Sequence, residues 1–269
     1  MAAGSLDTLR PGLLEGKRCL VTGAGSGIGR AIALRLIALG AHVTGAGRTI
    51  DTLQATGEQA AGLAGTYEAV VCDVRDADAV VDLVATAAGD YGLDLLVNNA
   101  GGQFYAPATD ISRRGWDSVI DLNLSSVFSI TLAARPHLAK RRGMVVSISL
   151  TGIDRGIMGA SHGVAARAGV LGLMRTLALE WGGDGIRLNC IGPGIVLTEN
   201  LDPKARDRIL ARMDAVPLGR ATETSEIAEL VGFLASDGGR LITGQLLQID
   251  GGAHIGPGIH AWEPERENA

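Results

Sequence analysis

The sequence predicts a single doubly wound α/β domain, with helices on both faces of a parallel sheet. Seven short apolar runs alternate with longer amphipathic stretches, and the runs near residues 19, 93 and 144 lack the polar alternation that one exposed face would give. The expected strands are residues 19–22, 41–46, 67–72, 93–98, 144–149, 187–191 and 245–249. Parallel strands need crossover connections, so helices should flank them.

The connections between these runs have helical spacing. Apolar residues recur every three or four positions after the first and third runs, at Ile28, Ile32, Leu36 and Leu39 and at Val80, Leu83, Val84 and Ala87. No composition break marks a second domain, so we expect one domain at 15–253 between an N-terminal arm, 1–14, and a C-terminal tail, 254–269. Residues 194–218 combine a glycine-proline turn with a charged helical piece, which predicts a lid over a site.

Composition excludes several classes of function. The net charge of -5 and the 3% aromatic content argue against nucleic-acid binding. Cys19, Cys72 and Cys190 lie far apart without metal-binding spacing, which predicts neither a metal site nor disulfides and favours a reducing cytoplasm. The start of the chain has no export-signal pattern, and no apolar run is long enough to span a membrane. We therefore expect a cytoplasmic protein that binds neither membrane nor nucleic acid.

A glycine-rich turn follows the first strand and opens the first helix. It contains Gly23, Ser26, Gly27, Ile28 and Gly29, spaced as GxxxGxG. Glycines allow close approach of a pyrophosphate, and the free N–H groups and dipole of a helix N-terminus favour its negative charge. A tight turn without a ligand is the alternative, but the strand-turn-helix context favours a dinucleotide site.

The ends of the second and third strands bear on which dinucleotide binds. The second strand ends in Gly-Ala-Gly-Arg48. An acidic residue at this position would bind the ribose 2′-hydroxyl of NAD, whereas Arg48 suits a 2′-phosphate and favours NADPH. A solvated surface role for Arg48 is the alternative. Asp73, followed by Val74, is placed to accept a hydrogen bond from the adenine amino group. An N-cap role for Asp73 in a helix at 76–91 is equally compatible with the sequence.

Further motifs resemble the short-chain dehydrogenase/reductase family over residues 14–253. They are Asn98-Asn99-Ala100-Gly101, Asn123 in DLNL, Pro193-Gly194 with Thr198, and Asp250-Gly251-Gly252. The resemblance implies a seven-stranded Rossmann fold, a nicotinamide cofactor and a homotetramer. It also implies cofactor contacts from Asn99, Gly101, Pro193, Gly194, Ile195 and Thr198.

The catalytic positions depart from that family's pattern of Ser followed by Tyr-x-x-x-Lys. Ungapped alignment places Leu150 at the Ser, Gly163 at the Tyr and Arg167 at the Lys, so that only Asn123 remains. Ser149 or Thr151 could supply a hydroxyl beside Leu150, although Ser149 could equally be a residue of the strand. A glycine cannot act as the acid that ketone reduction needs, and arginine stays protonated.

This loss favours reduction of a carbon–carbon double bond. Hydride addition to a 2-enoyl thioester makes an enolate, which needs hydrogen-bond donors at its oxygen but can take its proton from water. The segments NNAGGQFYAP and ASHGVAARAGV resemble the branch with peroxisomal trans-2-enoyl-CoA reductase and the 2,4-dienoyl-CoA reductases. We therefore expect an NADPH-dependent enoyl-thioester reductase. The alternatives are a divergent reductase, isomerase or cyclase, and a catalytically silent nucleotide-binding subunit.

Four groups of residues are candidates for the chemistry, each beside a structural alternative. Arg167 would hold the nicotinamide ribose and add positive charge, or form a surface salt bridge. His162 would donate to the thioester oxygen or relay a proton, or be a buried core residue. Asn123 would distort its helix and hold water, or be a tolerated poor helix former. Gln103, Phe104 and Tyr105 should face the substrate, and Tyr105 would be a reserve acid or a packing residue.

Overall fold

The seven expected strands form one parallel sheet in the computed structural model, which describes residues 8–199, 203–211 and 213–256. The strands are β1 (Arg18–Thr22), β2 (His42–Gly47), β3 (Thr66–Val71), β4 (Leu95–Asn98), β5 (Met144–Ile148), β6 (Arg187–Pro193) and β7 (Leu246–Ile249). Their order is β3-β2-β1-β4-β5-β6-β7. Val21 of β1 pairs with Gly45 of β2 on one side and with Val97 of β4 on the other.

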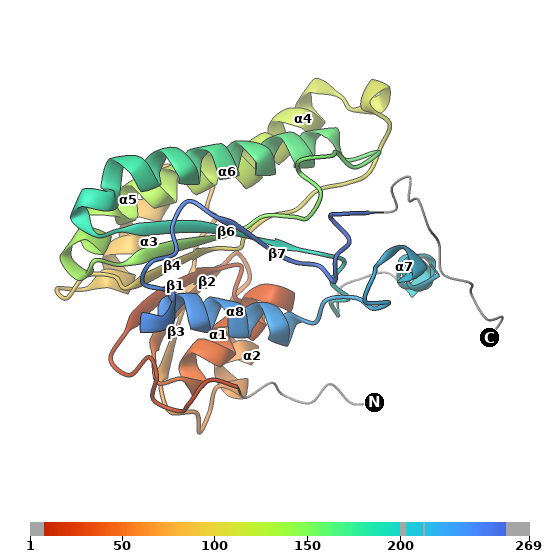
Figure 1. Cartoon of the computed structure of the whole chain (residues 1–269). Coiled ribbons are helices and arrows are strands. Elements are labelled where there is room, and N and C mark those ends of the chain that lie inside the picture. The colour runs from red at the N-terminus through yellow and green to blue at the C-terminus, as the bar shows by residue number, and fades with distance from the viewer. Residues whose placement is uncertain (1–7, 200–202, 212, 257–269) are drawn as a thin grey trace.

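Helices cover both faces of this sheet, as Figure 1 shows. They are α1 (Gly27–Ala38), α2 (Ile50–Gln59), α3 (Ala77–Ala88), α4 (Arg113–Ile120), α5 (Ser126–Arg141), α6 (Ser161–Trp181), α7 (Pro203–Leu210) and α8 (Thr224–Ala235). Helices α1 and α8 pack together on one face, and α3, α5 and α6 lie on the other. The chain therefore has the doubly wound architecture that its apolar runs predict.

Both faces of β1 are buried, which explains its lack of polar alternation. Cys19 and Val21 belong to the apolar core beneath α1 and α8, whereas Leu20 belongs to the core beneath α3, α5 and α6. Each of the three is at most 1% exposed. All three cysteines of the chain are buried free thiols. Among the described helices, none combines the length and apolar character needed to cross a membrane.

Helix α3 begins at an N-cap that corrects one sequence alternative. Asp76, and not Asp73, accepts hydrogen bonds from the backbone N–H groups of Asp78 and Ala79, both at 3.1 Å. These bonds satisfy donors that the first helical turn leaves unpaired. Asp73 lies ahead of the helix, just after the end of β3, and makes its contacts with Arg75.

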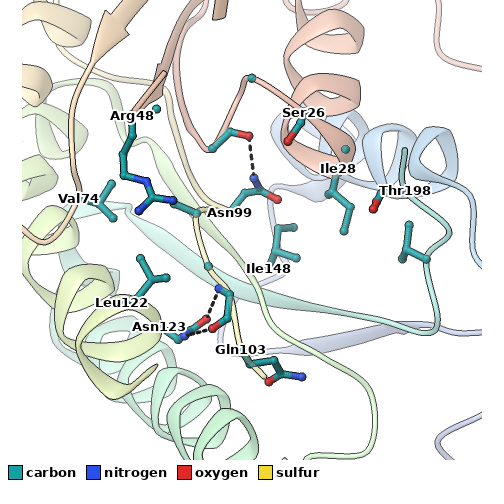
Figure 2. Close-up of a pocket in the computed structure, with 18 of the residues that line it drawn as sticks. Ser26, Ile28, Arg48, Val74, Asn99, Gln103, Leu122, Asn123, Ile148 and Thr198 are labelled. Carbon is teal, nitrogen blue, oxygen red and sulfur yellow. Dashed lines mark hydrogen bonds between the residues drawn. The ribbon is translucent and has the colours of Figure 1, made fainter. Parts of the chain in front are cut away.

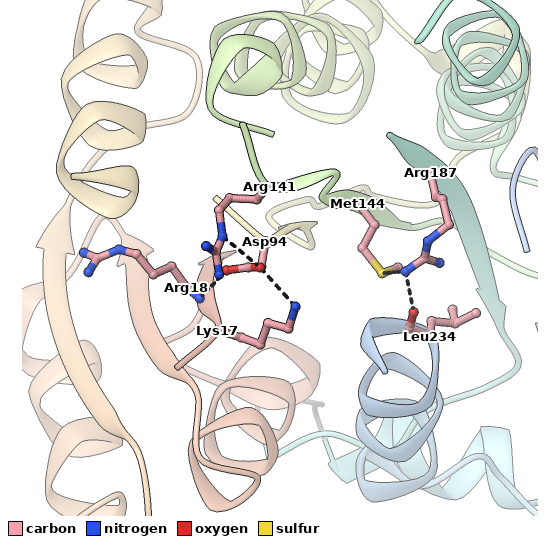
Figure 3. A network of polar contacts seen from close by, with 7 residues as sticks. All are labelled: Lys17, Arg18, Asp94, Arg141, Met144, Arg187 and Leu234. Atoms are coloured by element: carbon pink, nitrogen blue, oxygen red, sulfur yellow. Dashed lines mark hydrogen bonds and ion pairs between the residues drawn. The ribbon is translucent and has the colours of Figure 1, made fainter. Parts of the chain in front are cut away.

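A charged network fixes the amino ends of the strands, opposite the edge that carries the predicted site (Figure 3). Asp94 is buried just before β4 and accepts hydrogen bonds from Lys17 Nζ at 3.2 Å and Arg141 Nε at 3.3 Å. It also accepts from the backbone N–H of Arg18 at 3.0 Å, at the start of β1. Arg187 at the start of β6 donates to the Leu234 carbonyl at 2.9 Å. These polar contacts therefore lie at the amino ends of the strands, and the predicted ligand site lies at the opposite, carboxyl ends.

The predicted lid contains α7, which stands apart from the two helical layers in Figure 1. Within the predicted lid, residues 200–202 and 212 lie outside the described residues, as do residues 1–7 of the arm and 257–269 of the tail. A bridge between Val196 and Thr222 connects the start of the lid segment to the residues that precede α8.

Candidate active site

A cavity of about 570 Å³ lies at the carboxyl ends of the strands, where β1 separates β2 from β4. In open parallel sheets this reversal of strand order leaves a crevice for ligands. Most of the predicted site residues line it: Gly23, Ser26, Gly27, Ile28, Arg48, Asp73, Val74, Asn99, Gly101, Gln103, Asn123, Ser149, Arg167, Pro193, Gly194 and Thr198. In Figure 2 they extend from Arg48 at the upper left to Gln103 at the bottom.

The turn between β1 and α1 presents backbone donors to this cavity. Ser26 is the N-cap of α1, but its side chain caps no N–H group, and the first helical turn has no acidic residue. A Cβ atom at Gly29 would lie 2.1 Å from the Gly23 carbonyl oxygen, so only glycine lets the helix pack this closely on the turn. Asn99 Nδ2 fixes the turn by donating to the Thr22 carbonyl at 2.9 Å. This arrangement suits a pyrophosphate.

Glu199 reaches the same helix end from the segment after β6. Its Oε1 accepts hydrogen bonds from the Gly27 N–H at 3.0 Å and from Arg30 Nη1 at 3.2 Å. The bond from Gly27 is the largest of the effects that lower the pKa of Glu199, and the charge of Arg30 adds to it. The Glu199 carboxylate therefore lies at a helix N-terminus that favours anions, and it accepts a hydrogen bond from the N–H group that we expect to bind a phosphate.

The adenine end of the predicted site carries two arginines around one carboxylate. Arg48 follows β2 directly, and its exposed side chain lines the cavity. Asp73 accepts hydrogen bonds from Arg75 Nε at 2.9 Å and from the Arg75 backbone N–H at 3.1 Å. Hydrogen bonding from the Arg75 side chain is the main reason that the pKa of Asp73 falls to about 2, and Arg48 contributes through its charge. Asp73 is therefore ionised, and both cations stand near it.

Asn123 lies in the one π-helical turn among the described residues, Asp121–Ser125, between α4 and α5. Its Nδ2 donates to the Val119 carbonyl, four residues earlier, and to the Gly102 carbonyl, both at 2.8 Å. Its Oδ1 accepts from the Gly102 N–H at 3.2 Å and from Arg167 Nη2 at 2.9 Å. Asn123, in the helix distortion expected at this position, thus connects the loop after β4, as Figure 2 shows, to Arg167 of α6.

Arg167 contributes a fixed positive charge to the wall of the cavity. Besides the bond to Asn123, its Nη1 donates to the Ile148 carbonyl at the end of β5. Burial lowers the pKa of Arg167 to about 10, which leaves the guanidinium protonated at neutral pH. The side chain is therefore an electrostatic group and a hydrogen-bond donor, not a proton-transfer acid.

The structure separates the three hydroxyls near the end of β5. Ser147 Oγ accepts from Asn98 Nδ2 at 3.2 Å inside the core. Thr151 Oγ1 donates to Asp250. Ser149 is buried, lines the cavity, and its Oγ has no hydrogen-bond partner among the described residues. Ser149 is therefore the one of the three hydroxyls that remains available to a ligand.

Five predicted residues do not line this cavity, and one of them, Gly29, instead packs against the turn that does. His162 is fully buried, and its ring packs edge-on against Phe104 with centroids 4.4 Å apart and an interplanar angle of 77°. Neither ring nitrogen of His162 has a hydrogen-bond partner among the described residues. Tyr105 is 71% exposed and, like Phe104 and Ile195, is not part of the lining. Of the three predicted substrate residues, Gln103 alone reaches the cavity.

Sequence similarity assigns the chain to a family. Residues 23–254 match the family described as "Enoyl-(Acyl carrier protein) reductase". The chain is 39% identical over 247 residues to the "3-oxoacyl-(acyl-carrier-protein) reductase FabG" of Thermotoga maritima, across 90% of this chain and 99% of that protein. This chain belongs to the short-chain dehydrogenase/reductase family.

Two further relatives of this short-chain dehydrogenase/reductase are informative. The "Probable 2,4-dienoyl-CoA reductase" of Bacillus subtilis is 37% identical over 251 residues, across 91% of this chain and 99% of that protein. The crystal structure of a putative NAD(P)-dependent gluconate 5-dehydrogenase from Beutenbergia cavernae superposes with a TM-score of 0.85 at 34% identity. That match covers 91% of this chain and 100% of the other, which holds NADP at low occupancy.

As a member of this family the protein is an NAD(P)-dependent oxidoreductase. Its own residues fit such a cofactor. The N-terminus of α1, which Ser26 does not cap, could hold the pyrophosphate once Glu199 leaves the Gly27 N–H, and the same cavity contains Arg48, which would meet the adenosine end, and Asn123 and Arg167, which would meet the nicotinamide end. Among the described residues no cluster of three or more His, Cys, Asp or Glu side chains could hold a metal ion.

Sequence reasoning missed some residues of this site. Thr49, Thr52, Leu122, Ile148 and Val196 also line the cavity. The position of Ile148 at the end of a predicted strand was a usable signal, because ligands bind at the carboxyl ends of parallel strands. Glu199 had no such signal, since its bond to Gly27 joins residues 172 positions apart.

Proposed function

We propose that this short-chain dehydrogenase/reductase reduces the carbon–carbon double bond of an α,β-unsaturated acyl thioester with NADPH. The observation that carries the proposal is the composition of the cavity wall. Among the described residues that line it there is no tyrosine, and position 163 is glycine, whereas Ser149 offers a free hydroxyl and Arg167 offers donors and positive charge. Such a wall can stabilise an anionic oxygen, but it has no phenol to protonate an alkoxide.

The reaction divides between a hydride step and a proton step. NADPH, when bound, supplies the hydride. The substrate gains it at C3, the electron pair of the C2=C3 bond moves toward the thioester oxygen as an enolate, and C2 takes a proton from water. The products are the saturated thioester and NADP⁺. Arg167 adds positive charge near the developing enolate and holds Asn123 in place, and Ser149 offers a free hydroxyl for a donor or for ordered water.

Two relatives support the thioester class. The names of the Thermotoga and Bacillus proteins describe a 3-oxoacyl and a 2,4-dienoyl substrate, each carried as a thioester on acyl carrier protein or coenzyme A. The first relative favours ketone reduction as a second candidate, and the cavity wall argues against it. A divergent isomerase or cyclase and a silent nucleotide-binding subunit are the remaining alternatives, and both predict no reduction of either thioester.

An absorbance assay of NADPH oxidation separates these candidates. We expect turnover of crotonyl-CoA and no turnover of acetoacetyl-CoA. Reduction of acetoacetyl-CoA alone would contradict the proposal, and cofactor binding without turnover would favour the isomerase or the silent subunit. We assign NADPH because Arg48 replaces the acidic residue that suits NAD. Arg48→Ala should therefore lower the preference for NADPH over NADH, and an unchanged preference would refute that assignment.

The proposed assembly is a cytoplasmic homotetramer of the domain at 15–253, with 194–218 as a lid over the cofactor. Exposed apolar side chains on α5 and α6 support contact with further copies of the chain: Phe128 and Leu132 are 46% and 41% exposed, and Leu179 is 87% exposed. Burying such side chains between copies would stabilise an oligomer. Light scattering should give four times the chain mass of 27.7 kDa, and a monomer mass would refute this assembly.

A further inference from the structure

Gly163 and Gln103 share one space beside the cavity. Gly163 is buried in the first turn of α6, and Gln103 lies in the loop after β4. A Cβ atom built on Gly163 would lie 1.7 Å from Gln103 Oε1 and 2.9 Å from Gln103 Cδ, closer than Cβ atoms approach other atoms in proteins. The carboxamide of Gln103 thus fills the place where any side chain at position 163 would begin.

The carboxamide is anchored and still has a donor to offer. Gln103 Nε2 donates to the hydroxyl oxygen of Tyr105 at 3.2 Å. An amide nitrogen carries two N–H groups, so this bond leaves one for a ligand. Gln103 lines the cavity together with Asn123, Ser149 and Arg167, and its side chain is accessible. Figure 2 shows Gln103 at the lower end of the cavity, near Asn123.

We infer that Gln103 donates a hydrogen bond to the thioester carbonyl oxygen of the substrate, from the space that the absence of a side chain at Gly163 leaves open. The inference rests on the function proposed above and names the residue that contacts the reacting group. A carboxamide N–H stabilises negative charge on an oxygen without giving up its proton. It therefore suits an enolate that is later protonated at carbon by water, and it would not complete the reduction of a ketone.

The position of the donor then depends on both residues. Gln103 supplies the amide, and the missing side chain at Gly163 leaves room for it. Loss of the amide removes the donor itself. A methyl group at 163 leaves the amide in the chain but displaces it, since the contact of 1.7 Å cannot be relieved without moving the Gln103 side chain. If Gln103 contacted the substrate from another position, Gln103→Ala would remove that contact and Gly163→Ala would leave it intact.

The test compares Gln103→Ala and Gly163→Ala with a control in the same helix, Gly172→Ala, where an added Cβ would meet nothing within 4 Å. Steady-state turnover of crotonyl-CoA with NADPH gives kcat. Calorimetric titration of the cofactor-free chain with butyryl-CoA, the saturated product, gives a Kd that does not depend on turnover. Thermal unfolding shows whether each variant is folded.

We expect kcat to fall about 100-fold in both Gln103→Ala and Gly163→Ala, the scale of losing one donor to an anionic oxygen. The Kd of butyryl-CoA should rise only about 2- to 10-fold, since one hydrogen bond to a neutral carbonyl is lost. Gly172→Ala should match the unmodified chain in both measurements.

Each other outcome counts against a specific statement. If Gln103→Ala keeps the kcat of the unmodified chain, Gln103 is not the donor, although the proposed function stands. If Gln103→Ala loses activity and Gly163→Ala does not, the dependence of the donor on Gly163 is wrong. If the unmodified chain fails to reduce crotonyl-CoA, the proposed function is wrong, and the titration alone decides the contact: an unchanged Kd for butyryl-CoA, or no binding, overturns it.

Discussion

Replacing Glu199 with glutamine should tighten NADPH binding. The carboxylate of Glu199 accepts the Gly27 N–H at 3.0 Å, at the N-terminus of α1 where the pyrophosphate of a dinucleotide is expected. Two anions cannot share this donor without repulsion, so the carboxylate has to leave when the cofactor binds. Glutamine keeps an oxygen that can accept the same N–H, but it has no charge to compete with the phosphate.

The size of the effect follows from the contacts of Glu199. An anion at an exposed helix N-terminus contributes about 0.3–1 kcal/mol. The ion pair with Arg30 at 3.2 Å adds little, because the Glu199 side chain is 48% exposed. A loss of about 1 kcal/mol from the free chain corresponds to a Kd for NADPH that is about 5-fold lower in Glu199→Gln.

Fluorescence titration with NADPH measures this Kd, and Glu58→Gln is the matched control. Glu58 is an exposed residue of α2 outside the cavity lining, so its replacement removes the same charge from a different place. The difference between the two variants should shrink near 1 M salt, where charges are screened beyond about 3 Å. Glu199→Gln should also lower the Tm of the cofactor-free chain and increase the rise in Tm that NADPH causes.

An unchanged or higher Kd in Glu199→Gln would refute this reasoning. It would mean that the carboxylate does not have to be displaced, or that it makes a favourable contact with the bound cofactor. An equal decrease in Glu58→Gln would refute it in another way, because the effect would then come from net charge alone.

Two further predictions follow from the polar contacts of the site. Arg167→Met should lower kcat for crotonyl-CoA about 100-fold and Arg167→Lys less, because lysine keeps the charge but not the fork that reaches both Asn123 and Ile148. An equal loss of kcat in the two variants would show that the positive charge at position 167 does not contribute to catalysis. Burial raises the pKa of Asp250, but hydrogen bonds from Thr151, His254 and Gly252 together lower it by more than burial raises it. The pKa of Asp250 therefore lies below its usual value. Its ionised form therefore stabilises the fold above pH ~4, and this contribution is lost as pH falls through the folded pKa. Asp250→Asn should reduce the acid dependence of the unfolding free energy, and an unchanged dependence would contradict this.

The sheet could be predicted from sequence because burial on both faces leaves a local trace. Continuous apolar runs predicted strands at 19–22 and 144–149, and the structure has them at Arg18–Thr22 and Met144–Ile148. Helical spacing likewise predicted the buried faces of α1 and α3. Strand order and pairing were not predicted from sequence, since periodicity contains no information about which strands are neighbours.

The site was predictable where it follows strand ends and not where it depends on distant contacts. The turn at Gly23–Gly29 and the residues Arg48 and Asn99 follow strands, and all except Gly29 among the predicted turn residues line the cavity. His162 and Gly163 are adjacent, yet neighbours on a helix point about 100° apart, so one is buried against Phe104 and the other meets Gln103. Sequence spacing alone does not give the rotation of the helix.

The position of β1 between β2 and β4 has a consequence for how the chain acquires its structure. Val21 pairs with Val97, so β1 stays without one neighbour until the polypeptide through β4 has been synthesised. Pairings this distant in sequence close large loops and make folding slow. During translation the nascent chain therefore exposes the apolar face and edge of β1, and the demand for chaperones should be greatest before β4 leaves the ribosome.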